Sequence, residues 1–197
     1  MIAITPSEVT AVIAAGGRSS RFGQDKAGFP IGSSTMVERT IQTARRVSER
    51  VLIALPPEKP AEPKAWKSLR LTHEIVTDSP PGVGPIGALC AGLEACSGDW
   101  LLLLACDLPN LRPESLVGLL KTSPTDEYVS ATRDNEHFEP MVAVYHRNTL
   151  PKVHRQIEKE QFGLNVLLQS LKGRMVTFPA RELLNVNRPG DVPEGCL

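Results

Sequence analysis

The stretch that decides the fold is Ala14-Ala15-Gly16-Gly17-Arg18-Ser19-Ser20-Arg21-Phe22-Gly23-Gln24-Asp25-Lys26. It follows the apolar run 9–13, whose β-branched residues indicate a buried strand. A strand that leads into a glycine-rich loop places backbone N–H groups at the carboxyl edge of a sheet, where α/β folds bind anions. Two adjacent glycines let a phosphate approach the main chain, and Arg18, Arg21 and Lys26 add positive charge. The stretch therefore predicts a polyphosphate-binding loop.

This loop differs from the two commonest phosphate-binding loops. A P-loop has Gly-Lys followed by Ser or Thr, whereas Gly23 is followed by Gln24 and Asp25. The dinucleotide fingerprint G-x-G-x-x-G fails as well, because the glycines stand at 16, 17 and 23. Glycines and cations alone leave a solvated basic turn as the alternative interpretation.

Composition limits the classes of protein to which the chain can belong. With 197 residues, 41% hydrophobic and 22% charged, it fits one α/β domain spanning 1–197 with a core at about 9–191. The 22 basic and 22 acidic residues cancel, so no overall field attracts nucleic acid or an anionic membrane. Neither a membrane span nor a signal-peptide pattern is present, and the four cysteines lack C-x-x-C spacing. We expect a cytoplasmic protein with reduced thiols.

Strand and helix patterns alternate along the first two thirds of the chain. We expect strands at 9–15, 50–55, 71–76, 100–105, 127–132, 141–145 and 175–178. We expect helices from a cap at Ser33 or Ser34 to about 47, and at 86–95, 150–160 and 165–171. Nearly all-apolar strands alternating with helices predict an α/β fold with a doubly wound, mostly parallel sheet.

A second candidate site follows the most apolar strand, in Cys106-Asp107-Leu108-Pro109. A carboxylate that ends such a strand lies at the carboxyl edge of the sheet, beside the ligand of the first loop. Mg²⁺ prefers carboxylate and phosphate oxygens together, so Asp107 is a candidate magnesium ligand. The alternative role of helix N-cap fails because the next helix begins near Pro113, too far along the chain.

A third candidate site lies in the segment 77–89, which is rich in glycine and proline. Gly84-Pro85 opens a helix whose N-terminus carries the positive end of a dipole, and Gly87 lets a ligand lie close to it. An ordinary loop-to-helix junction is the alternative. The histidines at 73, 137, 146 and 154 show no metal-like spacing and are interpreted as surface or packing residues.

These motifs together resemble the molybdenum cofactor guanylyltransferases, within the nucleotidyltransferase superfamily. The family loop runs approximately Leu-Ala-Gly-Gly-x-Ser-x-Arg-Met-Gly-x-Asp-Lys; here Ala14 replaces Leu and Phe22 replaces Met. Further matches are the turn at Asp107, the segment 78–87, the strand 139–145 and the closing segment Asn185-Val186-Asn187. Ala54 stands near the position where the family often has an asparagine that touches the nucleotide.

The resemblance implies specific site residues. Nucleotide binding falls to Ala14, Ala15, Gly16, Gly17, Arg21, Lys26, Asp78, Gly87 and Asp107. Arg21, Lys26 and Asp107 are the implied catalytic residues, with Asp107 as the magnesium ligand, and Glu139 and Asn187 bind the acceptor.

The implied reaction transfers GMP from GTP to the phosphate of molybdenum-molybdopterin and releases pyrophosphate. We expect at most transient contacts with molybdoenzymes or other proteins of cofactor biosynthesis. Two alternatives remain strongest: a cytidylyltransferase for the same cofactor, and a non-catalytic nucleotide-binding partner. A sugar-1-phosphate nucleotidyltransferase is disfavoured because those enzymes are usually longer.

Overall fold

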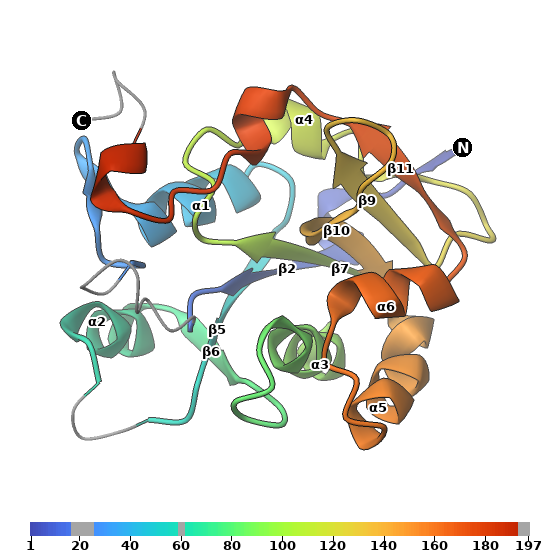
Figure 1. Ribbon diagram of the computed structural model, residues 1–197, viewed down its shortest axis with the longest axis horizontal. Helices are drawn as coiled ribbons and strands as arrows, with labels where there is room; N and C mark the ends of the chain where they lie inside the picture. Colours follow the sequence, from blue (N-terminus) through green and yellow to red (C-terminus); the bar gives the residue numbers. More distant parts are fainter. Residues whose placement is uncertain (17–25, 59–61, 193–197) are drawn as a thin grey trace.

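The central element of the protein is a seven-stranded sheet (Figure 1). The computed structural model describes residues 1–16, 26–58 and 62–192. Across the sheet the strands are ordered β11 (Gly173–Thr177), β9 (Tyr128–Thr132), β10 (Glu139–His146), β7 (Trp100–Ala105), β2 (Val9–Ala14), β5 (Arg50–Leu55) and β6 (Glu74–Thr77).

The pairing of these strands confirms the predicted, mostly parallel sheet. Strand β2 pairs in parallel with β5 on one side and β7 on the other, and β6 continues the parallel set beyond β5. Strand β10 runs antiparallel to both of its neighbours, β7 and β9. Since β9 and β10 are joined by the short segment 133–138, they form a hairpin at one side of the sheet.

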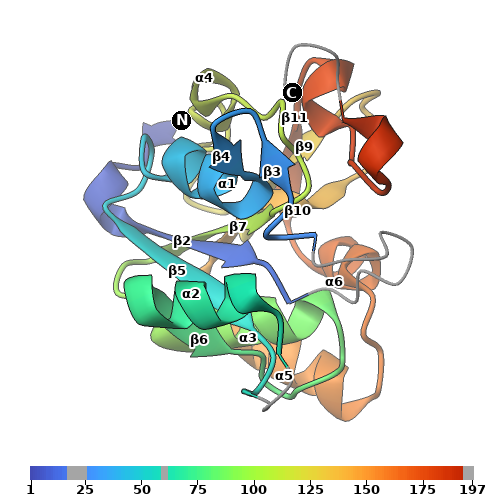
Figure 2. The same ribbon diagram turned by 90° about the vertical axis from the view of Figure 1, so that its left-hand side faces the viewer.

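Helices cover both faces of the sheet (Figures 1 and 2). Apolar residues of α1 (Met36–Ala44), α2 (Lys64–Thr72) and α4 (Pro113–Leu116) pack on one face. Those of α3 (Pro85–Ala95), α5 (Leu150–Glu158) and α6 (Leu164–Ser170) pack on the other. Alternate residues of β7 point to opposite faces, with Leu102 and Leu104 on the first and Leu101 and Leu103 on the second. Burial on both faces explains why β7 is apolar throughout.

Several predicted boundaries were wrong. Helix α1 ends at Ala44 rather than near 47, and β10 and β11 each begin two residues earlier than predicted. The strand expected at 71–76 begins at Glu74, because Leu71 belongs to α2, whose Trp66 and Leu69 share one buried helical face. The cap of α1 is Thr35 rather than Ser33 or Ser34. The Thr35 hydroxyl accepts from the Glu38 backbone N–H at 3.4 Å, and the Glu38 carboxylate accepts from the Thr35 N–H at 2.7 Å. This reciprocal capping box fixes the start of α1.

Two small ribbons complete the described structure. Strands β3 (Pro30–Ile31) and β4 (Ser34–Thr35) lead into α1, and β1 (Ile2–Ala3) pairs with β8 (Lys121–Thr122). Among the described residues no helix is both long enough and apolar enough to cross a membrane.

Candidate active site

The candidate site lies at the carboxyl edge of the parallel strands. The last residue of β2, Ala14, is paired with Ala54 of β5 and with Ala105, the last residue of β7. Leu55 is in turn paired with Thr77, the last residue of β6. The segments that follow these strands therefore leave the sheet at one edge, as the sequence motifs predict.

Gly16 lies where the chain leaves β2 and makes a close backbone approach. The N–H of the preceding Ala15 donates to the Ala54 carbonyl oxygen at 3.1 Å, which extends the pairing with β5. A Cβ atom on Gly16 would lie 2.5 Å from Pro56 Cδ and 3.5 Å from the Asp78 carboxylate. Position 16 therefore accepts no side chain without a shift of the Pro56 ring. The predicted site residues Gly17 and Arg21 lie outside the described residues.

Lys26 and Asp107, predicted separately from two motifs, are in direct contact. Lys26 Nζ donates to Asp107 Oδ2 at 2.7 Å, and their side chains are only 16% and 18% exposed. The same ammonium group donates to Asn187 Oδ1 at 3.1 Å. The fold thus brings Asp107 and Asn187, from two distant parts of the chain, into contact with the ammonium group of Lys26.

The C-terminal segment reaches this cluster because its apolar residue is anchored. Val186 is buried against Ile31 and Met36, at the start of α1. The Val186 N–H donates to the backbone oxygen of Asp107 at 2.9 Å. This anchoring directs Asn187 toward Lys26 and brings Asn185 Nδ2 to 3.5 Å from Asp107 Oδ2.

The second carboxylate oxygen of Asp107 bears on whether the site suits magnesium. Asp107 Oδ1 is buried and has no hydrogen-bond partner among the described residues. A buried carboxylate oxygen without a donor is unfavourable, and a cation satisfies it. The Asp107 carboxylate and the Asn187 amide are hard oxygen donors of the kind that Mg²⁺ prefers, so the residues fit this metal. Asp107 has in addition the counter-charge of Lys26, which the local sequence does not reveal.

Asp78, which follows β6, and Gly87, in the first turn of α3, lie at the same carboxyl edge of the sheet. The Asp78 N–H donates to the Leu55 oxygen at 3.0 Å, and the Ser79 N–H donates to the Gly87 oxygen at 3.1 Å. A Cβ on Gly87 would lie 2.8 Å from the Pro80 oxygen, so the first turn of α3 sits directly against this loop. Partial burial raises the pKa of Asp78, because a carboxylate is less well solvated there than in water.

Glu139 starts β10 at the same edge, because Val142 of β10 is paired with Leu104 of β7. Its carboxylate forms an ion pair with Arg133, and its backbone N–H donates to Ser130 Oγ at 3.1 Å. The Arg133 guanidinium also donates to the Leu183 oxygen at 3.4 Å. The structure thus places Glu139 near the site, and its binding of an acceptor remains a prediction.

The chain matches the MobA-like NTP transferase domain over residues 11–175. It belongs to the MobA-like NTP transferase family. It is therefore a nucleotidyltransferase, and the sheet edge described above is its candidate active site.

Curated relatives cover nearly the whole chain. A protein from Nostoc sp. named probable molybdenum cofactor guanylyltransferase is 29% identical over 190 residues, covering 94% of this chain and 89% of the relative. A protein of the same name from Rhodopirellula baltica is 30% identical over 195 residues, with 95% and 91% covered. This MobA-like chain thus spans most of the length of both relatives.

Solved structures show the same fold. A protein from Aquifex aeolicus superposes with a TM-score of 0.75 at 24% identity, covering 93% of this chain and 95% of that one. The molybdopterin-guanine dinucleotide biosynthesis protein A from Archaeoglobus fulgidus superposes with a TM-score of 0.74 at 21% identity, with 93% and 94% covered. At these identities the likeness establishes the fold of this MobA-like enzyme.

Two contributors to the site of this MobA-like enzyme were not singled out by the sequence motifs. Pro56 closes one side of the Gly16 position, and Asn185 approaches Asp107 from the C-terminal segment. The alternation of polar and apolar residues in Asn185-Val186-Asn187 is the signal that could have found Asn185. With Val186 buried, its two neighbours share the opposite side.

Proposed function

We propose that this enzyme transfers GMP from GTP to the phosphate of molybdenum-molybdopterin, giving the guanine dinucleotide form of the cofactor and pyrophosphate. The names of the curated relatives support this reaction. The observation that carries it is the cluster of Lys26, Asp107 and Asn187 at the sheet edge, with Asp107 Oδ1 buried and lacking a donor. This arrangement suits a triphosphate bound with a divalent cation better than it suits a neutral ligand.

The reaction needs positioning and charge stabilisation more than covalent chemistry. An oxygen of the acceptor phosphate forms a new bond to the α-phosphorus of GTP, in line with the bond to the β-phosphate. The bond between the α-phosphorus and the oxygen that bridges to the β-phosphate breaks, and pyrophosphate leaves with the electron pair of that bond. The attacking phosphate is already ionised at neutral pH, so no general base is required.

The chain's own residues supply the positioning. The backbone at Ala14, Ala15, Gly16 and Gly17 approaches the phosphates, and Lys26 and Arg21 neutralise charge on the leaving pyrophosphate. Asp107, with Asn187, would hold Mg²⁺, which when bound polarises the α-phosphoryl group and neutralises phosphate charge. Glu139 and Asn187 orient the acceptor beside the β9–β10 hairpin.

Asp78 is the residue that favours guanine. A carboxylate accepts two hydrogen bonds side by side, and guanine offers two adjacent donors on its pairing edge where cytosine offers one amino group. The partial burial that raises the pKa of Asp78 also increases the free energy that hydrogen bonds from such donors contribute to binding. Gly16 borders this carboxylate and Gly87 borders the Asp78 Cβ, so backbone without side chains lies on both sides of Asp78.

A cytidylyltransferase is the second candidate, favoured by one observation. Ala54, followed by Leu55 and Pro56, stands where the resembling family often has an asparagine that touches the nucleotide, so base contacts at this strand end differ. We test both candidates by measuring pyrophosphate release with molybdenum-molybdopterin, Mg²⁺ and GTP, CTP or ATP. A higher kcat/KM with GTP is expected; equal or greater activity with CTP would overturn the guanylyl assignment.

A further inference from the structure

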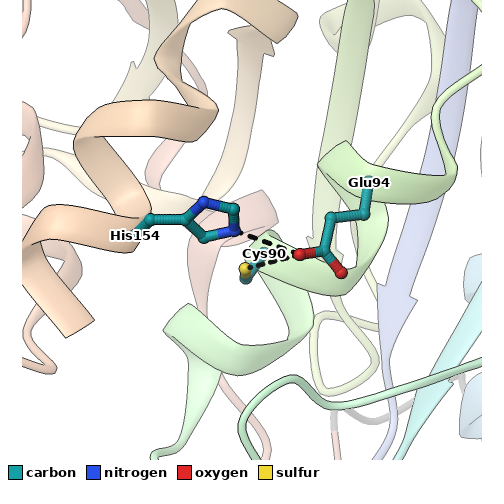
Figure 3. A group of neighbouring side chains, drawn as sticks. All are labelled: Cys90, Glu94 and His154. Atoms are coloured by element: carbon teal, nitrogen blue, oxygen red, sulfur yellow. Dashed lines mark hydrogen bonds and ion pairs between the residues drawn. The ribbon is translucent and has the colours of Figure 1, made fainter. Parts of the chain in front are cut away.

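A second group of polar side chains lies on the face of the sheet covered by α3 and α5. Cys90 and Glu94 stand one turn apart on α3, and His154 faces them from α5 (Figure 3). One ligand atom from each residue, the Cys90 sulfur, a Glu94 carboxylate oxygen and a His154 ring nitrogen, lies within 4.8 Å of the other two. Three side chains of types that bind metal ions thus meet between two helices.

The contacts within this cluster are specific. Cys90 Sγ donates to Glu94 Oε1 at 3.7 Å, and His154 Nε2 lies 3.0 Å from the same oxygen. Cys90 is 2% exposed, whereas the side chains of His154 and Glu94 are 47% and 45% exposed. The sulfur is therefore fixed by packing, and the other two donors remain open to solvent on one side.

We propose that Cys90, Glu94 and His154 form a binding site for a divalent transition-metal ion, with Zn²⁺ as the ion it fits. The protein supplies three ligands, and a water molecule completes a tetrahedral shell. Sulfur, imidazole nitrogen and carboxylate oxygen together select zinc over magnesium or calcium, which take oxygen ligands.

Two of the three donor-to-donor distances are close to what zinc requires. With zinc–ligand bonds of about 2.0–2.3 Å, donor atoms around a tetrahedral ion lie roughly 3.3–3.6 Å apart. The sulfur-to-oxygen and nitrogen-to-oxygen distances of 3.7 and 3.0 Å bracket this range. Glu94 Oε1 contacts both of the other donors, and because the Glu94 side chain is half exposed, it can rotate to admit an ion without movement of the backbone.

In the metal-free protein the neutral Cys90 thiol donates to the Glu94 carboxylate, and zinc would replace the proton of that thiol. A thiolate and a carboxylate side by side repel each other, and a divalent cation bound to both offsets this repulsion. As the zinc–sulfur bond forms, the thiol proton passes to solvent. Because His154 belongs to α5 and the other ligands to α3, the ion would tie the two helices together and stabilise the folded chain.

The site is tested on the full-length protein, first stripped of metal with a chelator. Zn²⁺ is titrated by calorimetry, and Co²⁺ is used as a spectroscopic probe for thiolate ligation. The variants Cys90→Ser and His154→Gln each remove one ligand with little change of shape. Cys96→Ser is the matched control, since Cys96 is a buried thiol that follows α3 and whose sulfur lies 3.3 Å from the backbone oxygens of Gly98 and Trp100.

We expect one Zn²⁺ per chain and a rise in Tm of roughly 5–10 °C at about 100 times Kd, for a chain of this size. Both effects should be lost in Cys90→Ser and His154→Gln and kept in Cys96→Ser and Asp107→Asn. Loss in Asp107→Asn would place the ion at the candidate active site and overturn the proposal. So would a Co²⁺ spectrum without a thiolate band, or zinc binding unchanged in both ligand variants. Unfolding temperatures of the metal-free variants separate a lost ligand from a damaged fold.

Discussion

Replacing Asp107 with asparagine removes one charge from the centre of the candidate active site. Asparagine keeps the size and one oxygen that can accept a hydrogen bond, but it cannot form the ion pair that joins Asp107 Oδ2 to Lys26 Nζ at 2.7 Å. It also reduces the attraction of the buried position at Oδ1 for a divalent cation. The substitution should therefore affect both stability and catalysis.

The stability effect follows from the burial of the pair. Both side chains are less than one fifth exposed, so a hydrogen bond between charged groups there contributes about 1.5–3 kcal/mol. For a chain of this length that free energy lowers Tm by roughly 3–12 °C. Lys26→Met should cost a similar amount. Because each single variant already loses the contact, the double variant should be less destabilised than the sum, by about 1.5–3 kcal/mol.

The catalytic effect should be larger than the loss of stability suggests. Pyrophosphate release in the presence of Mg²⁺, measured below the Tm of each variant, should fall by about 10²–10³ in Asp107→Asn, as when one preorganised charge stabiliser is lost. Two results would refute the reasoning. Strictly additive free energies of unfolding would show that Lys26 and Asp107 are not coupled, and full Mg²⁺-dependent activity would show that the metal has other ligands.

Three further predictions concern the neighbouring residues. Gly16→Ala places Cβ 2.5 Å from the Pro56 ring and should lower the free energy of unfolding, measured with denaturant, by about 1–3 kcal/mol. Gly163→Ala is the control, because a Cβ there lies 3.6 Å from its nearest neighbour and should not lower stability. Equal effects of the two substitutions would contradict the close approach at Gly16. Asp78 has a raised pKa, so its carboxylate opposes folding above that pKa and not below the ordinary value of 3.8. Asp78→Asn should therefore raise Tm at pH 7 and leave it unchanged near pH 3; a gain independent of pH would refute this. Lys26→Ala should reduce kcat by about 10²–10³, with a smaller loss of GTP affinity measured by calorimetry. Near-normal turnover would show that Lys26 does not take part in catalysis.

The strands of the sheet centre were predictable because one physical signal determines them. The strands β2, β5 and β7 are buried on both faces, so their sequences are apolar except for Thr10 and Arg50, and their boundaries agree with prediction within a residue. Helix α2 was not predicted. It follows a proline-rich segment, packs mainly through Trp66 and Leu69, and leaves Leu71 exposed. A short helix with a narrow apolar face has a weak periodic signal.

The candidate site was predictable as separate motifs but not as an assembly. Lys26 and Asp107 are 81 residues apart, and Lys26 and Asn187 are 161 apart, so no local pattern indicates that they touch. The same limit explains His154, which is 60 residues from Glu94 and shows no metal-like spacing in the sequence. Contacts of this kind depend on which strand ends meet at one edge and which helices share one face.

The contact between Lys26 and Asp107 has a consequence for how ligands enter the proposed site. Without ligand, Lys26 balances the charge of Asp107, so neither group is buried as an isolated ion. A magnesium ion arriving alone would approach the Lys26 ammonium group and be repelled by it. A magnesium–triphosphate complex brings a cation for the buried Asp107 Oδ1 and an anion for Lys26. The ion pair between Lys26 and Asp107 would then be replaced by two, Asp107 with magnesium and Lys26 with phosphate, so that no charge is left without a partner. For the proposed reaction we therefore expect nucleotide and metal to enter together rather than the metal first.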